Sequence, residues 1–156
     1  MNHDKNLARA IRYATTSPDP NTQNAALIYK DDKLVSADVN RFTDYMADFP
    51  ARWEPEYKYT YVEHAERNAI YSAAKVGKML LSTVMYAPFA SCSDCARGII
   101  QCGIKTLVRY PFEVPERWRE STRMGDLMLR ESGIQIIELT PTVGVELRFN
   151  GQNLEL

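Results

Sequence analysis

Two short segments of the chain carry residue types that bind metals and move protons. His64 and Glu66 are separated by one residue, and Cys92 and Cys95 are separated by two, with each pair at the expected start of a helix. Two thiolates and one imidazole make a three-ligand zinc shell with a fourth position open to water, which is the catalytic arrangement, whereas four protein ligands would close the site. The spacing therefore predicts a zinc site formed by His64, Cys92 and Cys95.

Glu66 is expected to carry protons rather than to bind the metal. It lies two residues from His64, so both side chains cannot coordinate one ion in the same manner. Zinc can lower the pKa of a bound water from about 15.7 to about 7. A carboxylate beside that water can take its proton and pass it to a ring nitrogen and to a leaving amine. The pattern resembles the site of zinc-dependent nucleobase deaminases, which have a His/Cys/Cys shell and a glutamate that does not bind the metal, and it predicts that Glu66 is an acid/base residue.

The elements that must hold these segments follow from apolar spacing and from turn residues. An antiparallel hairpin comes first, and strands alternate with helices from residue 82 onward, which implies crossovers and parallel pairing. A mixed sheet with helices on both faces follows, and residues 40–62 between the two halves read as a long irregular loop rich in aromatic residues. The expected helices are 4–16, 65–76, 92–102 and 118–132, and the expected strands are 25–29, 34–39, 82–87, 106–110, 134–139 and 143–149.

Length and composition restrict the class of protein. The 156 residues fit one domain spanning 1–156, and a net charge of -1 provides no general basic field for stable nucleic-acid binding. No apolar run approaches the roughly 18 residues that span a bilayer, and the first residues contain no signal-peptide core. Three cysteines within eleven residues suit a metal site in a reducing compartment better than a disulfide framework. We therefore expect a cytoplasmic protein without a membrane partner.

Three segments resemble the zinc-dependent cytidine and deoxycytidylate deaminases, most closely the deoxycytidylate branch. Residues 61–70 (YVEHAERNAI) are similar to that family's Y-V-x-H-A-E-x-N-A-I, and residues 20–23 (PNTQ) are similar to its P-N-S-Q. Residues 92–105 (CSDCARGIIQCGIK) are similar to its C-x-x-C-A…I-I-x-x-G-I-K. The resemblance covers about residues 18–139.

The resemblance implies a fold and a substrate. The fold is a three-layer α/β/α sandwich with a five-stranded mixed sheet, with Zn2+ between two helix N-termini. The implied reaction is hydrolysis of a free pyrimidine nucleotide, dCMP to dUMP, by a homo-oligomer. Asn40 matches the asparagine of the family's G-Y-N-G-x-P pattern, and the resemblance implies that it binds substrate on the sugar side.

The chain departs from the family pattern at three places. Ser91 stands where the family has the proline before the first cysteine. Asp38 and Arg41 replace two glycines beside Asn40, which predicts weaker control by deoxynucleoside triphosphates, because glycine permits close approach to a phosphate. Residues 109–112 (RYPF) do not match the family's usual loop.

Alternatives remain open at this level. The same chemistry could act on a nucleoside, a modified cytosine nucleotide or a purine, and two other classes are a nucleic-acid editing protein and a non-catalytic zinc module. Arginines after the second cysteine segment could bind a phosphate or could form a solvated helix face. The sequence does not choose among Arg109, Arg117, Arg119, Arg123 and Arg130.

Overall fold

A five-stranded mixed sheet forms the centre of the computed structural model, which describes residues 1–156. The strand order is β2-β1-β5-β6-β7. Strand β1 is antiparallel to both β2 and β5, whereas β5, β6 and β7 run parallel, as the alternating pattern predicted. The strands are β1 (Ala25–Lys30), β2 (Lys33–Val39), β5 (Val84–Tyr86), β6 (Thr106–Arg109) and β7 (Gln135–Glu138).

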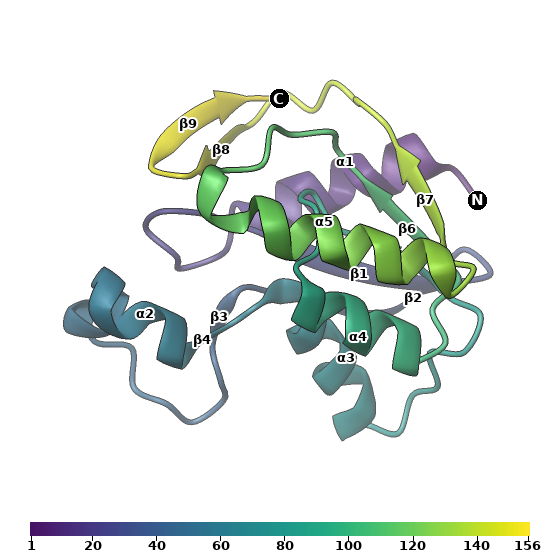
Figure 1. Ribbon diagram of the computed structural model, residues 1–156, viewed down its shortest axis with the longest axis horizontal. Coiled ribbons are helices and arrows are strands. Elements are labelled where there is room, and N and C mark those ends of the chain that lie inside the picture. Colours follow the sequence, from purple (N-terminus) through teal and green to yellow (C-terminus); the bar gives the residue numbers. More distant parts are fainter.

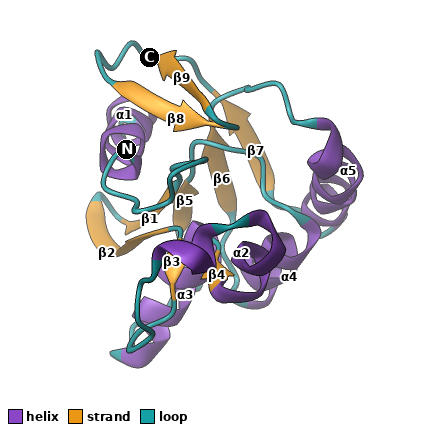
Figure 2. Ribbon diagram, turned by 90° about the vertical axis from the view of Figure 1, so that its left-hand side faces the viewer, coloured by secondary structure: helices purple, strands orange, loops and turns teal.

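Helices cover both faces of this sheet and complete the predicted three-layer sandwich. Helix α1 (His3–Ala14) lies on one face, and α3 (Ala65–Lys75), α4 (Ser93–Gln101) and α5 (Glu116–Glu131) lie toward the other (Figures 1 and 2). Successive strand residues point to opposite faces, so Met85 packs in the core beneath α3 and α4 while Tyr86 packs beneath α1. Both are fully buried, which explains why the central strands read as continuous apolar runs.

Residues 40–62 are more ordered than the sequence predicted. They contain the paired strands β3 (Arg41–Phe42) and β4 (Val62–Glu63), the short helix η1 (Pro50–Trp53) and α2 (Pro55–Tyr61). A proline begins each helix, where its missing N–H costs nothing. We call residues 43–61 the arm, because it projects from the body of the molecule (Figure 1).

The end of the chain forms a hairpin rather than the expected single strand over 143–149. Strands β8 (Glu146–Phe149) and β9 (Gln152–Glu155) pair across a turn in which Asn150 and Gly151 both have positive φ. Leu147 is fully buried beside α1, so this hairpin belongs to the core on that face. No helix in the fold combines the length and apolar character needed to cross a membrane.

Candidate active site

Two helix N-termini bring the predicted metal ligands together. His64 precedes the first turn of α3, Cys92 precedes the first turn of α4, and Cys95 lies within that turn. The His64 Nδ1 atom is 3.5 Å from the sulfur of each cysteine, and the donor atoms all lie within 4.8 Å of one another. A tetrahedral zinc with bonds of about 2.3 Å to sulfur and about 2.0–2.1 Å to nitrogen separates such donors by roughly 3.5 Å. The donor set and its spacing therefore fit zinc.

The electrostatics of the site favour a thiolate at Cys92. A hydrogen bond from the Cys95 thiol lowers the pKa of Cys92 to about 3, and a further one from His64 acts in the same direction. The Cys95 pKa rises well above its usual value because its thiol donates to Cys92 and is buried. The positive end of the α4 dipole also stabilises negative charge at this position. The pair thus offers the anionic sulfur that a zinc ion requires.

Glu66 lies in the first turn of α3 and is almost inaccessible to solvent, with 2% of its surface exposed. Burial raises its pKa, although the nearby His64 opposes that shift. Its Oε2 atom is buried and has no hydrogen-bond partner. A buried carboxyl group with a free oxygen beside a metal-type donor set is suited to exchange protons with a bound reactant.

Helix α5 supports the cysteine segment from behind. A Cβ atom at Gly125 would lie 2.6 Å from the carbonyl oxygen of Ser91, so only glycine permits this approach. The Ser121 hydroxyl accepts a hydrogen bond of 3.1 Å from the backbone N–H of Ser93. The loop before α4 is consequently held between the sheet and α5, even though it lacks the proline of the family pattern.

Arg67 was not singled out from the sequence, although it follows Glu66 directly. Its guanidinium lies 3.4 Å from the sulfur of Cys95 and 4.0 Å from that of Cys92. It also forms an ion pair with Glu63, one turn earlier along the chain. The positive charge of Arg67 favours the thiolate forms of the sulfurs beside it, and it lowers the pKa of Cys95 against the larger effects that raise that pKa.

A pocket of about 120 Å³ opens beside His64 and Glu66. Its walls come from the turn at residues 19–24, the arm, the start of α3, the loop before α4, the start of α5 and the C-terminal hairpin. The Trp118 ring meets the His64 ring edge to face at 5.6 Å, and Phe89 stacks on Phe149 at 4.4 Å. Besides His64 and Glu66, the residues that give the pocket its aromatic and charged character are Asp19, Lys58, Tyr59, Phe89, Phe112, Glu113, Arg117, Trp118 and Phe149.

Asn40 lies in the pocket wall, but protein groups occupy its amide. Its nitrogen donates to Asp19 at 2.9 Å and to the Thr22 carbonyl at 2.8 Å, while its oxygen accepts from the Asn24 N–H at 2.7 Å. The structure thus places Asn40 as the residue that fixes the turn at 19–24. A direct contact between Asn40 and substrate remains a prediction.

A buried ion pair between Lys58 and Asp19 also lines the pocket, and sequence reasoning missed it. Lys58 Nζ lies 2.8 Å from each carboxylate oxygen of Asp19, and the two residues are 7% and 2% exposed. The pair ties the arm to the turn at 19–24. The charges are 39 positions apart, so no local pattern could have joined them.

The five candidate arginines separate clearly in space. Arg109, Arg119 and Arg123 form ion pairs with carboxylates, and Arg130 does not line the pocket. Arg117 lines the pocket, and its guanidinium donates to the side-chain oxygen of Asn150 at 2.7 Å without a carboxylate partner. It is therefore the member of this group that is available to an anionic ligand.

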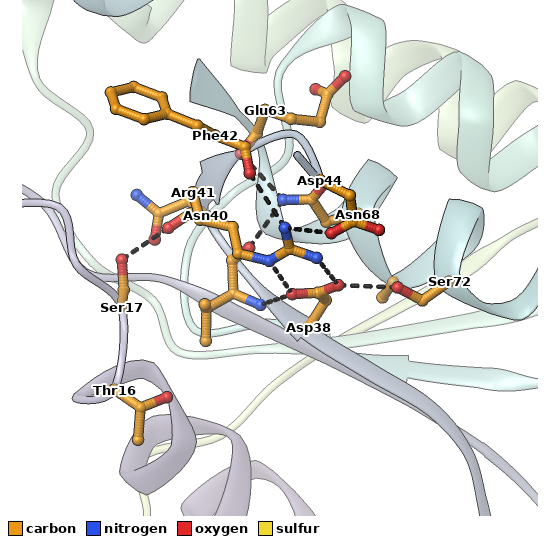
Figure 3. Close-up of polar contacts among 12 residues, drawn as sticks. Thr16, Ser17, Asp38, Asn40, Arg41, Phe42, Asp44, Glu63, Asn68 and Ser72 are labelled. Atoms are coloured by element: carbon orange, nitrogen blue, oxygen red, sulfur yellow. Dashed lines mark hydrogen bonds and ion pairs between the residues drawn. The ribbon is translucent and has the colours of Figure 1, made fainter. Parts of the chain in front are cut away.

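Asp38 and Arg41, the two residues that replace glycines of the family pattern, form a polar network with each other (Figure 3). Two guanidinium nitrogens of Arg41 lie 2.9 Å from the two oxygens of Asp38, and a third lies 2.8 Å from Asp44. Ser72 of α3 donates to Asp38 at 2.8 Å. Asn68, buried on the same helix, donates to the Val39 carbonyl at 2.9 Å. These contacts fasten β2 and β3 to α3 and leave Arg41 with its charge already paired.

The sheet order makes this protein an α/β sandwich, and the His/Cys/Cys set beside a buried glutamate is a site of the zinc-deaminase type. A crystal structure of dCMP deaminase from the cyanophage S-TIM5, in complex with dCMP and dUMP, has the same fold, with a TM-score of 0.72 at 18% identity. The match covers 87% of this chain and 95% of the phage chain.

Sequence comparison then identifies the family. The model of the cytidine and deoxycytidylate deaminase zinc-binding region matches residues 1–110, and the chain belongs to this family of hydrolytic deaminases. An uncharacterized deaminase of Aliivibrio fischeri is 32% identical over 123 residues, which are 77% of this chain and 81% of that protein. Deoxycytidylate deaminase of Mus musculus is 29% identical over 142 residues, 86% of this chain and 78% of that protein.

Proposed function

We propose that this deaminase hydrolyses the exocyclic amino group of a free pyrimidine nucleoside monophosphate, with dCMP converted to dUMP as the leading reaction. The observation that carries the proposal is the pocket itself. It joins the His/Cys/Cys donor set, whose two cysteines are buried, and the free oxygen of Glu66 to Arg117, an arginine in the pocket wall that has no carboxylate partner.

Zn2+ held by His64, Cys92 and Cys95 would supply Lewis-acid chemistry that makes water more acidic. Glu66 takes one proton from the attacking water and delivers it to the ring nitrogen, and it then takes the second proton from the same oxygen and delivers it to the departing amine. Overall, oxygen from water replaces the amino group and ammonia leaves. Because burial raises the pKa of Glu66, the group holds a proton readily enough to act as an acid after it has acted as a base.

Arg117 supports a phosphorylated substrate. Its guanidinium has donors to spare, since its hydrogen-bond partner is the neutral Asn150. A charge-assisted hydrogen bond from arginine to phosphate is worth about 1.5–3 kcal/mol. If that bond is made in the transition state, a monophosphate gains roughly ten- to a hundred-fold in kcat/KM over its nucleoside.

Relatives support the pyrimidine base, and the exposed surface of the arm supports a homo-oligomer. The cyanophage enzyme was solved with dCMP and dUMP, and the mouse relative is a deoxycytidylate deaminase. The arm exposes large apolar rings of the kind that subunit interfaces cover, with Tyr45 98% and Phe49 55% exposed. We expect several copies of this chain to associate, with free nucleotides rather than nucleic acid as substrates.

The test is an ammonia-release assay on zinc-loaded protein with a matched substrate panel. The substrates are dCMP, deoxycytidine, guanine, deoxyadenylate and a cytosine-containing oligonucleotide. We expect the highest kcat/KM with dCMP. Equal or better use of the nucleoside, the purines or the oligonucleotide would overturn the nucleotide proposal, and the family membership would stand.

A further inference from the structure

Asn24 is a polar residue at the start of an otherwise apolar strand. It directly precedes β1, whose first five residues are all buried, and it lines the same pocket as His64 and Glu66. Its side-chain Oδ1 atom is shielded from solvent and has no hydrogen-bond partner. Buried polar atoms are normally paired, because an unpaired one loses its hydration without compensation. An asparagine in this place therefore needs an explanation that the contacts within the protein do not provide.

The backbone of Asn24 is hydrogen-bonded to Asn40, the residue that the family resemblance places on the sugar side. The Asn24 N–H donates to Asn40 Oδ1 at 2.7 Å, and the Asn40 N–H donates to the Asn24 carbonyl at 3.2 Å. The amide nitrogen of Asn40 donates to Asp19 and to the Thr22 carbonyl, which uses both of its hydrogens. Asn24 thus lies in the same part of the wall as Asn40, with a carboxamide oxygen that is still unpaired.

The alternation of β1 puts the Asn24 side chain on the side of the sheet that holds the metal ligands. Side chains two positions apart in a strand share a face, so Asn24 continues the face of Ala26. Ala26 packs with Ala65 of α3 in one core cluster, and Ala65 lines the pocket beside His64. The last torsion of an asparagine side chain is soft, and no bond holds this oxygen, so the carboxamide can turn toward a ligand in the pocket.

The unpaired atom is an acceptor, which decides the part of a nucleotide that it can bind. A phosphate group presents acceptor oxygens near neutral pH, and the carbonyl oxygen and ring nitrogen on the pairing edge of cytosine are acceptors as well. The donors of dCMP are its exocyclic amino group and its 3′-hydroxyl group. The amino group has to lie beside Glu66 to be replaced. The 3′-hydroxyl group is therefore the complement of the Asn24 oxygen.

We propose that Asn24 is a specificity-determining residue that accepts a hydrogen bond from the 3′-hydroxyl group of the nucleotide. The proposal rests on the proposed function, which places the amino group of the substrate at the metal end of the pocket. It gives to Asn24 the sugar contact that the resemblance alone gives to Asn40. The nucleotide is then recognised at three points, with its amino group at Glu66, its sugar at Asn24 and its phosphate at Arg117.

The first experiment compares dCMP with 2′,3′-dideoxycytidine monophosphate, which lacks only the 3′-hydroxyl group, in zinc-loaded protein. We expect the wild type to prefer dCMP about ten-fold in kcat/KM, the effect of roughly one hydrogen bond. Asn24→Leu has a similar shape and no acceptor, so its preference should fall below about two-fold. The matched control is Asn21→Ala, because Asn21 lies in the same turn but does not line the pocket, and it should keep the wild-type preference. A wild type without the preference, or an Asn24→Leu protein that keeps it, would overturn the proposal.

Thermal stability separates a role in binding from a role in folding. An unpaired oxygen that serves the ligand destabilises the ligand-free protein, so Asn24→Leu should melt at the wild-type temperature or above it. Asn24→Ala removes the same oxygen without adding a branched side chain, and it should show the same loss of preference for dCMP. Failure of both variants to fold would show that the side chain holds the fold, and it would overturn the proposal.

A binding measurement that needs no turnover separates this proposal from the proposed function. Calorimetry should show that the zinc-loaded wild type binds dUMP about ten-fold more tightly than 2′,3′-dideoxyuridine monophosphate. Asn24→Leu should bind the two within about two-fold. Equal binding of the two nucleotides by the wild type, or binding of neither, would overturn the proposal. If no substrate in the panel is deaminated, the proposed function fails, and this comparison still decides the role of Asn24.

Discussion

Glu66, the proposed proton-carrying residue, is buried at a cost in folding free energy. Its carboxyl group is 2% exposed, and its Oε2 atom has no protein partner. An isolated charge in such a place is unfavourable, so burial raises the pKa of Glu66. The same feature that prepares the group to exchange protons therefore weakens the folded state around it.

Glu66→Gln is expected to retain zinc and to lose roughly 10²–10⁴-fold in turnover, because an amide cannot carry the protons. Equal zinc content in variant and wild type, together with initial rates, checks this. Turnover within a few fold of wild type would remove Glu66 from the proton-carrying role.

The same variant makes a prediction about stability and pH. The folded-state pKa of Glu66 is raised, so ionisation costs stability as pH rises above the unfolded value of about 4.3. Metal-free Glu66→Gln should thus be more stable than metal-free wild type at pH 7, by on the order of 1–3 kcal/mol. Urea titrations at pH 7 and below about pH 4 should show that the difference in stability between the variant and the wild type disappears at the lower pH.

A matched control for this stability effect is Glu131→Gln. Glu131 is exposed at the end of α5, and its substitution should change stability by less than about 0.5 kcal/mol at any pH. A wild type as stable as Glu66→Gln at pH 7 would show that the carboxylate finds a stabilising partner inside the folded protein.

At the scale of elements, the site depends on how closely α5 approaches the loop before α4. Gly125 is in the interior of α5, where glycine is a poor helix former. The close contact with the Ser91 carbonyl explains its presence. Helix α5 thereby positions Cys92 without contributing a ligand.

Gly125→Ala should consequently destabilise the protein, by about 1–3 kcal/mol, because the added methyl group displaces the ligand loop. We expect weaker zinc binding as well, measured by competition with a chromophoric chelator. The matched control is Gly98→Ala in α4, where the new Cβ would meet side-chain atoms only, the end of Ile70 at 3.4 Å and the Arg67 Cγ at 3.9 Å. That variant should be neutral or stabilised by up to about 1 kcal/mol. Equal effects of the two substitutions would contradict the packing argument.

The C-terminal hairpin is the second element that shapes the site. Phe149 stacks on Phe89 inside the pocket, and Asn150 accepts from Arg117. The backbone N–H of Asn150 donates to Thr22 at 3.0 Å, so the hairpin also holds the turn at 19–24. One hairpin near the end of the chain thus joins three walls of the pocket.

At the scale of the whole molecule, the proposed zinc ligands come from two separate parts of the fold. His64 begins α3 and Cys92 begins α4, 28 positions later. Zinc that binds only the folded state stabilises it by mass action, by about 4 kcal/mol when free zinc is a thousand-fold above its Kd. Zinc bound to these residues would therefore hold the two helix ends together and stabilise the fold, in addition to its part in the chemistry.

Removal of zinc by a chelator should lower the melting temperature by on the order of 10 °C, and added zinc should restore it. Metal analysis should give one zinc per chain. Cys92→Ser should lose zinc and respond little to the chelator. Cys102→Ser is the control, because Cys102 ends α4 outside the donor set, and it should behave as wild type. Full zinc occupancy in Cys92→Ser would show that the ligand assignment is wrong.

Local spacing by itself was enough to predict a mixed sheet with helices on both faces, and it selected His64, Glu66, Cys92 and Cys95 as candidates for a metal site and its proton carrier. Those features depend on residues a few positions apart, where strand and helix geometry dictates which side chains share a face. Strand pairing then followed from the alternation of elements, which permits few topologies. The structure agrees with each of these predictions of the fold and brings the three ligand side chains together.

Only the tertiary structure decided which polar groups meet across long separations in the chain. In the folded protein Arg117 lines the pocket without an ion pair, whereas the neighbouring arginines are paired with carboxylates or lie outside the pocket. Lys58 meets Asp19, and the Asn40 amide is hydrogen-bonded to protein groups. The physical reason is that a charge or hydrogen-bonding group can be satisfied by any complementary partner that the packed fold brings near, and sequence spacing carries no record of that choice.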